Sequence, residues 1–241
     1  MANAARKWLP LALIAGAMAT GAWLVRDLPP TVTIDLRGLL PFALEPTGDS
    51  APRWVAVLGL PAIATSIWAL LNAGRRPAAM RLTRLFFRDT PEALTDPAVV
   101  DRFRGTYDTI VLCVVVLILG VHAGMIAAAL GHDTLGPRII TVVMGISLAA
   151  AGNVMPRLRP NLVAGVRTRA TLTDPALWRA THRVLGFGFV IAGIVTAIVG
   201  LAAPAYGLPT AVVTLIAACI LATVGGLRAR RATASPTNVW S

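Results

Sequence analysis

Six apolar stretches, each about as long as a membrane is thick, constrain this chain more than any other feature. A helix needs roughly 20 mostly apolar residues to cross a hydrocarbon core of about 30 Å. Stretches of this kind occur at 8–25, 54–73, 108–130, 139–155, 184–203 and 208–227. Only 14% of the 241 residues are charged, whereas soluble domains contain about 25%. We therefore expect an all-α, polytopic membrane protein with six transmembrane helices.

The basic residues predict how the chain crosses the membrane. Eighteen of the 22 Lys and Arg residues lie in the two terminal tails and in the loops 74–106 and 156–183. Loops rich in Lys and Arg stay on the cytoplasmic side. Both termini and these two loops are therefore expected in the cytoplasm, with the loop 26–53 on the extracytoplasmic side.

The six apolar stretches divide the chain into two halves of three predicted helices each. The N-terminal half is residues 1–130 and the second half is residues 131–231. The connections at 131–138 and 204–207 are short, which predicts antiparallel neighbouring helices. The polar tail at 232–241 is expected to be disordered.

Two loop segments have patterns of their own. Alternation of polar and apolar residues at 31–34 predicts a short extended segment, and an apolar patch follows at 39–44. In the second loop, Leu82, Leu85 and Phe86 recur at helical spacing between arginines. That pattern predicts a short helix lying in the headgroup region.

Composition and motifs exclude several functional classes. The net charge of +11 is typical of nucleic-acid binding, but these residues flank the spans, where anionic headgroups attract each by about 1 kcal/mol. We therefore expect no direct contact with nucleic acid. Cys113 and Cys219 lie in apolar runs and are expected to be small buried hydrophobic residues. No cluster of residues has metal-ligand spacing and no phosphate-binding loop is present, so no enzyme activity, cofactor or metal is expected.

Ionisable residues inside a bilayer are default candidates for a functional site, and few occur here. His122 is the titratable side chain that lies well inside a span. Either it bonds to a backbone carbonyl as a neutral ring, or it relays protons, which would need a carboxylate that no span supplies at that depth. Asp108, at the start of the third stretch, is expected to stay hydrated or to pair with Arg102 or Arg104.

The stretch from Gly152 to Gly193 carries the most specific pattern. Pro156 is expected to end one helix, and Thr173 or Asp174 to cap the next, with Pro175 in its first turn. Along that next helix Trp178, His182 and Leu185 share one face. We expect Trp178 at the membrane interface, as part of an aromatic belt.

This stretch resembles the SdpI family of bacterial immunity membrane proteins. It reads G-N-x-M-P-x-x-R-x-N, then G-x-R-T, T-L and W-x-x-T-H-R-x-x-G. The matching positions are Asn153, Pro156, Arg159, Asn161, Gly165, Arg167, Thr168, Trp178, Thr181, His182 and Gly186. An outer segment common in the family is matched only at Leu28, Pro29 and Val32, and its His-aromatic pair is absent.

The resemblance implies a plasma-membrane protein that protects a bacterial cell from a secreted antimicrobial peptide. It also implies recruitment of a cytoplasmic repressor, in which case the outer loop would engage the peptide and the loop 156–183 would report it. Arg159, Arg167 and His182 would then line a polar inner pocket or partner surface, whereas the remaining motif residues could serve only to fix the loop. Alternatives are a small transporter or channel, a membrane enzyme acting on lipid, and a receptor or assembly subunit with no toxin partner. The ligand and the oligomeric state stay open.

Overall fold

The computed structural model describes residues 2–33, 50–86 and 91–234, and most of them are helical. The long helices are α1 (Ala2–Leu24), α2 (Arg53–Ala73), α5 (Arg104–Ala129), α6 (Leu135–Val154), α8 (Pro175–Ala202) and α9 (Gly207–Ala234). The short ones are α3 (Pro77–Arg84), α4 (Pro97–Asp101) and α7 (Arg169–Thr173), with single 3-10 turns η1 (Glu92–Thr95), η2 (Met155–Arg157) and η3 (Pro204–Tyr206). The predicted all-helical fold is confirmed.

Five helical segments within the described residues are long and apolar enough to cross a membrane. They are Arg53–Ala73, Arg104–Ala129, Leu135–Arg157, Pro175–Ala202 and Pro204–Gly226. The first predicted span corresponds to a shorter apolar stretch, Trp8–Leu24, inside α1. Helix α9 continues to Ala234, so the first three residues of the predicted tail are helical, and the rest of that tail lies outside the described residues.

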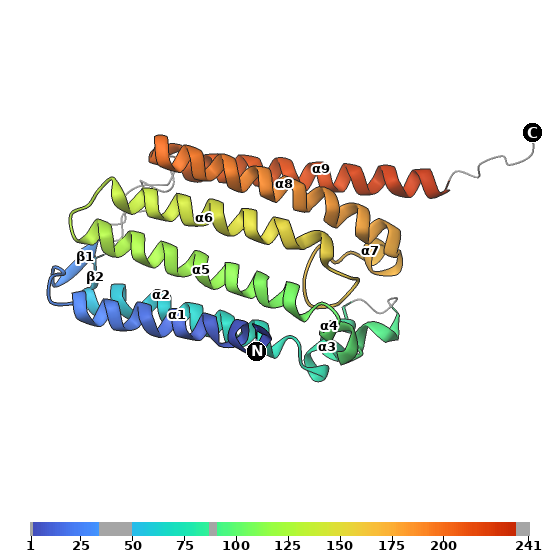
Figure 1. The fold of residues 1–241 in the computed structure, drawn as a ribbon, viewed down its shortest axis with the longest axis horizontal. Helices are drawn as coiled ribbons and strands as arrows, with labels where there is room; N and C mark the ends of the chain where they lie inside the picture. Colours follow the sequence, from blue (N-terminus) through green and yellow to red (C-terminus); the bar gives the residue numbers. More distant parts are fainter. Residues whose placement is uncertain (1, 34–49, 87–90, 235–241) are drawn as a thin grey trace, which may run out of the picture.

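The long helices lie side by side along one bundle (Figure 1). Helix α6 packs between α5 and α8, α9 packs on α8, and α1 and α2 pack on α5. The strands lie at one end of the bundle, called here the hairpin end, and α3, α4 and α7 lie at the opposite end, the α7 end (Figure 1). Helix α1 runs toward the hairpin end and α9 runs away from it (Figure 1).

Glycines bring α6 and α8 into backbone contact. A Cβ placed on Gly152 would lie 2.6 Å from the Gly186 carbonyl oxygen, and one on Gly145 would lie 2.5 Å from that of Gly193. The pairs repeat every seven residues on both helices, so the contact follows one line along each. Small residues of this kind allow close helix packing within a membrane.

At the hairpin end, β1 (Thr31–Thr33) pairs antiparallel with β2 (Ser50–Pro52). The extended segment predicted at 31–34 is therefore confirmed as far as Thr33. The backbone N–H of Arg53 donates to the Pro30 carbonyl at 3.0 Å, which ties the hairpin to the start of α2. The predicted apolar patch at 39–44 lies outside the described residues.

At the α7 end, a short helix follows α2 as predicted. Helix α3 ends at Arg84. Leu82 on this helix, and Leu85 and Phe86 just beyond it, are 61%, 59% and 77% exposed. Met80 on the same helix is buried, so one side of α3 packs inward while the other presents apolar side chains outward. This is the pattern of a helix lying in a membrane interface.

Candidate functional site

A buried apolar core at the α7 end holds the motif residues in place. It is built from α3, η1, α4, the start of α5, the segment after α6, α7, the first half of α8 and one residue of α9. Its buried members are Met80, Leu94, Val99, Phe103, Tyr107, Val111, Met155, Leu158, Leu162, Leu172, Trp178, Leu185 and Ala222. The two loops 74–106 and 156–183 therefore pack on each other and on the bundle. They form one folded unit rather than two separate solvated connections.

Trp178 lies at the centre of this core, and its predicted place in an interfacial aromatic belt was wrong. The side chain is fully buried, and its indole Nε1–H donates to the Leu158 carbonyl at 2.8 Å. The segment after η2 covers the ring and supplies the acceptor that a buried indole requires. Trp178 therefore fastens this segment to α8.

His182 stacks on Trp178 and is equally buried. The ring centroids are 4.0 Å apart with an interplanar angle of 19°. Nε2 accepts a hydrogen bond from the Val166 backbone N–H at 3.0 Å, and Nδ1 lies 2.9 Å from the Trp178 carbonyl. Because Nε2 is an acceptor, the proton of the neutral ring is on Nδ1 and donates to that carbonyl. Both nitrogens are occupied by backbone partners, so neither is free to act as a base.

Gly165 allows the backbone to approach His182 this closely. Its φ is +102°, a conformation that side chains with a Cβ rarely adopt, and a Cβ there would overlap His182 Nε2 and lie 3.1 Å from Cδ2. Both the positive φ angle and the nearby His182 ring therefore require a glycine at this position.

Asn161 and Thr168 shape the segment between η2 and α7. Asn161 is fully buried; its Oδ1 accepts from the backbone N–H groups of Val163 and Ala164 at 2.8 and 2.7 Å, and its Nδ2 donates to the Arg159 carbonyl at 2.6 Å. Thr168 caps α7 through a reciprocal capping box with Thr171. These amide and hydroxyl groups satisfy backbone groups that a turn leaves unpaired.

The other motif residues lie around this unit. Pro156 packs against Gly186, where an added Cβ would lie 2.8 Å from Pro156 Cδ. Thr181 is buried against Gly226 of α9. Asn153 is exposed. Arg167 is exposed, and its Nη1 donates to the Leu162 carbonyl at 2.5 Å. Arg159 is exposed too, and it lines a groove between η2 and the start of α8. Of the three residues expected to line a polar pocket, His182 is therefore sealed in the core, and the two arginines face outward.

The hydrogen-bond cap of α8 is Asp174, one of the two residues predicted for that role. Its Oδ1 accepts from the backbone N–H groups of Ala176 and Leu177 at 2.8 and 3.1 Å. Trp178, His182 and Leu185 then fall on the buried face of α8, which confirms the predicted periodicity. The cap begins the helix at the position that directs this face into the core.

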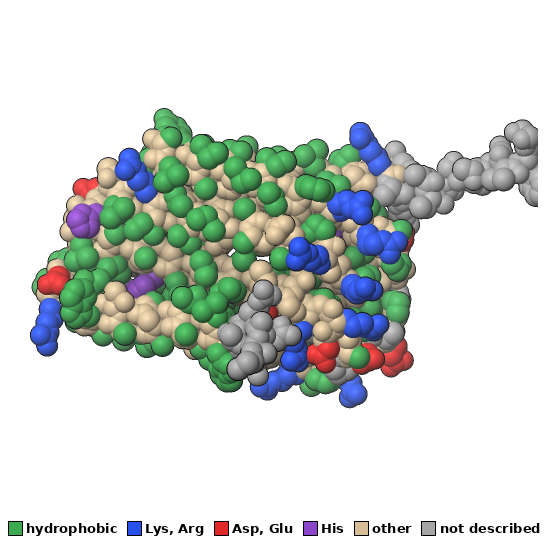
Figure 2. Space-filling model, viewed as in Figure 1, with side chains coloured by type: hydrophobic (Ala, Val, Ile, Leu, Met, Phe, Trp, Pro, Cys, Tyr) green, Lys and Arg blue, Asp and Glu red, His purple; other side chains and the backbone are tan. Residues whose placement is uncertain are grey.

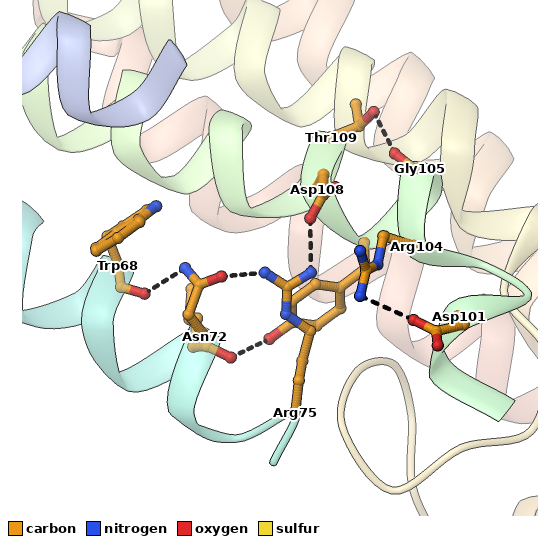
Figure 3. Close-up of polar contacts among 10 residues, drawn as sticks. Trp68, Asn72, Arg75, Asp101, Arg104, Gly105, Asp108 and Thr109 are labelled. Atoms are coloured by element: carbon orange, nitrogen blue, oxygen red, sulfur yellow. Dashed lines mark hydrogen bonds and ion pairs between the residues drawn. The ribbon is translucent and has the colours of Figure 1, made fainter. Parts of the chain in front are cut away.

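A polar cluster that sequence reasoning missed joins α2 to α5 at the α7 end (Figure 3). Arg75 Nη1 lies 2.7 Å from Asp108 Oδ1, its other terminal nitrogen bonds to the Asn72 side chain, and its guanidinium lies 4.8 Å from the Tyr107 ring. Tyr107 donates to the Leu71 carbonyl at 2.8 Å. We call Asn72, Arg75, Tyr107 and Asp108 the α2–α5 clasp.

The predicted partners of Asp108 were wrong. Arg104 pairs with Asp101 at 2.9 Å, and Arg102 Nε donates to the Ala98 carbonyl. Both arginines are near Asp108 in sequence, but Asp101 and the local backbone engage them. Arg75 reaches Asp108 because α2 and α5 are packed together. The only signal in the sequence was that Arg75 follows one span and Asp108 begins the next.

His122 is buried in α5. The expectation of a neutral ring bonded to a backbone carbonyl stays a prediction. Its Nδ1 is buried without a hydrogen-bond partner, and an apolar cavity of about 340 Å³ between α1 and α5 lies beside it. Among the described residues no three His, Cys, Asp or Glu side chains are grouped to hold a metal ion.

The comparison with protein families falls on this unit. Residues 157–228 match the SdpI/YfhL protein family. The resemblance predicted from the motif is thereby confirmed over this segment, which runs from η2 through α8 into α9. Nine of the eleven SdpI motif residues lie inside it, whereas Asn153 and Pro156 precede it. No curated protein and no solved structure matched the chain.

Proposed function

We propose that this protein is an integral membrane immunity protein that protects a bacterial cell from a secreted antimicrobial peptide or toxin. The observation that carries the proposal is the SdpI-family match at residues 157–228. It coincides with the folded unit around Trp178 and His182, in a chain with five helices able to span a membrane. In this proposal the protein acts by binding and has no catalytic turnover, which agrees with a histidine whose two nitrogens both bond to backbone.

The proposed topology has six spans in the plasma membrane, with both termini in the cytoplasm. Lys and Arg side chains gather at the α7 end on the face seen in Figure 2, with few at the hairpin end. Helix α1 packs along α2 and α5. This packing supports α1 as a span in addition to the other five, despite its shorter apolar stretch. The run of α1 toward the hairpin end and of α9 away from it fits an even number of crossings (Figure 1).

The proposed mechanism divides the work between the two ends of the bundle. The hairpin end, outside the cell, meets the peptide, and the folded unit at the α7 end reports the bound state to a cytoplasmic repressor. Support for a mechanical connection comes from α5, which carries His122 near the hairpin end and the α2–α5 clasp at the α7 end. Tyr107 of the clasp lies in the same buried core as Leu158 and Leu162 of the loop 156–183.

Expression in a sensitive host tests immunity directly. Cells producing the protein and control cells carrying the empty expression vector are exposed to a panel of secreted antimicrobial peptides. The panel begins with any peptide encoded beside this gene. The protein is expected to raise the peptide concentration needed to stop growth. Arg167→Gln is expected to weaken protection at equal membrane abundance, whereas Arg76→Gln, at an exposed arginine outside the motif, is expected to protect fully. Unchanged sensitivity to every peptide at full abundance would count against immunity.

Reporter fusions test the topology independently of any toxin. Alkaline phosphatase, which is active only outside the cytoplasm, is fused after residue 30 and after residue 170. Activity is expected for the fusion at 30 and none for that at 170. The reverse result would invert the chain and with it the proposed roles of the two ends.

A further inference from the structure

A basic groove at the α7 end has the features of a lipid site. Its cavity volume is about 610 Å³, within the range of roughly 300–1,000 Å³ typical of small-molecule sites. The groove lies between η2 and the start of α8. Its lining consists of three arginines, three prolines and one leucine: Arg157, Arg159, Arg179, Pro156, Pro160, Pro175 and Leu158. It therefore lies where two spans, α6 and α8, end on the same side of the bundle.

The charge of the groove is uncompensated. Among the side chains that the structure describes, no ion pair includes an arginine of the groove; Arg75, Arg84 and Arg104 pair instead with carboxylates elsewhere. The neighbouring carboxylate, Asp174, directs its Oδ1 to the first N–H groups of α8. Three exposed guanidinium groups thus converge on a space with no acidic side chain in its lining. Guanidinium groups bind phosphate through charge-assisted, often paired hydrogen bonds.

An exposed apolar strip leads away from the groove along α8. From Arg179 the outward face continues through Arg183 to Phe187, Ile191, Ile194 and Ile198, spaced three or four residues apart. Phe187 and Ile191 are 64% and 62% exposed. At 1.5 Å per residue they lie about 12 and 18 Å from Arg179 along the helix axis, which is about the depth of one leaflet of a core roughly 30 Å thick.

We propose that this groove is a specific site for an anionic phospholipid of the inner leaflet. The headgroup phosphate lies among Arg157, Arg159 and Arg179, and an acyl chain runs along Phe187 and Ile191. The strip decides the class of ligand: a soluble anion or an acidic protein segment would use the arginines but would leave the apolar strip unused. Basic recesses between spans on the cytoplasmic side are known to hold anionic headgroups in this way. The inference depends on the proposed topology and not on immunity.

Lipid titration of the full-length protein in a neutral detergent tests the site. Phosphatidylglycerol and phosphatidylcholine are added separately, and bound lipid is counted by mass spectrometry of the intact complex. We expect one saturable, high-affinity molecule of phosphatidylglycerol and none of phosphatidylcholine. Taking the attraction of an anionic surface for one arginine as the scale, Arg159→Gln should weaken binding about fivefold, and Arg159→Gln with Arg179→Gln about 30-fold.

Matched variants separate a site from a general effect of charge. Arg76→Gln removes an exposed arginine at the same end of the bundle but outside the groove, and should leave affinity unchanged. Ile191→Ser should weaken phosphatidylglycerol binding while the arginines remain, because it interrupts the strip. Thermal unfolding curves of each variant without lipid show whether the fold is retained.

Three results would overturn the proposal. The first is wild-type affinity in the folded double arginine variant, and the second is an equal loss with Arg76→Gln. The third is binding of glycerol 3-phosphate, which has the charge and no acyl chain, as tightly as the lipid, since that would make the groove a site for soluble anions. None of these readouts depends on protection from a toxin, so failure here and failure of the immunity proposal are distinguishable.

Discussion

Replacing Gly165 with alanine measures how much one contact of His182 stabilises the fold, the contact with the segment 158–168 between η2 and α7, here called the motif loop. The chain offers a matched control, because Gly131 also has a positive φ, +86° against +102° for Gly165, but a Cβ on Gly131 would meet nothing within 4 Å. Both substitutions force an L-residue into an unfavourable dihedral region, at about 1–2 kcal/mol. Only Gly165→Ala also places a methyl group against the His182 ring.

The second contribution follows from the surroundings of that ring. His182 cannot swing aside, because it is stacked on Trp178 and bonded on both nitrogens. The clash is therefore expected to break the bond from the Val166 N–H to Nε2, and an unsatisfied buried group costs about 1–3 kcal/mol. Gly165→Ala should lower the free energy of unfolding by about 2–5 kcal/mol in total, and Gly131→Ala by only the first part.

Unfolding in mixed detergent micelles, titrated with dodecyl sulfate and followed by far-ultraviolet circular dichroism, compares the two variants with the wild type. The quantity of interest is the difference between them, since the backbone contribution is shared. An equal loss in both variants would mean that the Gly165–His182 contact contributes nothing, and the account of the motif loop as a fastened unit would be refuted.

Three other predictions follow from the same structure. Nitrogen-15 spectra of histidine-labelled protein should show His182 as a neutral ring protonated on Nδ1, and a proton on Nε2 would reverse the donor assignment made from Val166. Asp108→Asn removes the negative charge that pairs with Arg75, and the two side chains of this pair are only 12% and 17% exposed. The substitution should lower the free energy of unfolding by about 1–3 kcal/mol. Asp101→Asn, in a pair whose side chains are 59% and 61% exposed, should change it little, and equal effects of the two substitutions would contradict the importance of burial. Gly193→Val should lower the free energy of unfolding by about 1–3 kcal/mol through overpacking against α6, because a Cβ on Gly193 would lie 2.5 Å from the Ala149 nitrogen. Gly16→Val should be tolerated, because a Cβ on Gly16 would meet nothing within 4 Å. Tolerance at both positions would argue against the close contact between α6 and α8.

Several parts of the fold could be predicted because they depend on neighbours in sequence. Hydropathy placed the long helices. Thr173 or Asp174 was predicted to cap α8, and Asp174 does so; alternation at 31–34 predicted an extended segment, of which Thr31–Thr33 is a strand. The periodicity that put Trp178, His182 and Leu185 on one face was also correct. In each case the relevant geometry, helix rise or strand alternation, repeats within a few residues.

The wrong predictions concern partners that are distant in the chain. An isolated Trp at the end of a span is typical of an interfacial belt, and nothing near Trp178 in sequence reveals that Leu158, 20 residues earlier, accepts its indole proton. Arg102 and Arg104 were chosen for Asp108 by proximity, whereas the actual partner, Arg75, is 33 residues away. The motif singled out His182 without revealing that both of its ring nitrogens lie against backbone groups.

The sequence by itself determined an apolar, all-helical chain, the sorting of its arginines, and the family pattern in its second half. These follow from side-chain composition and local spacing, which are properties of the unfolded chain as much as of the folded one. Only the tertiary structure decided that the two loops at the α7 end form a common core, that α2 and α5 are clasped through Arg75, and that an uncompensated basic groove meets an apolar strip on α8. The physical reason is that each of these depends on which helices lie side by side, and glycine contacts and buried hydrogen bonds select that arrangement only once the helices have packed.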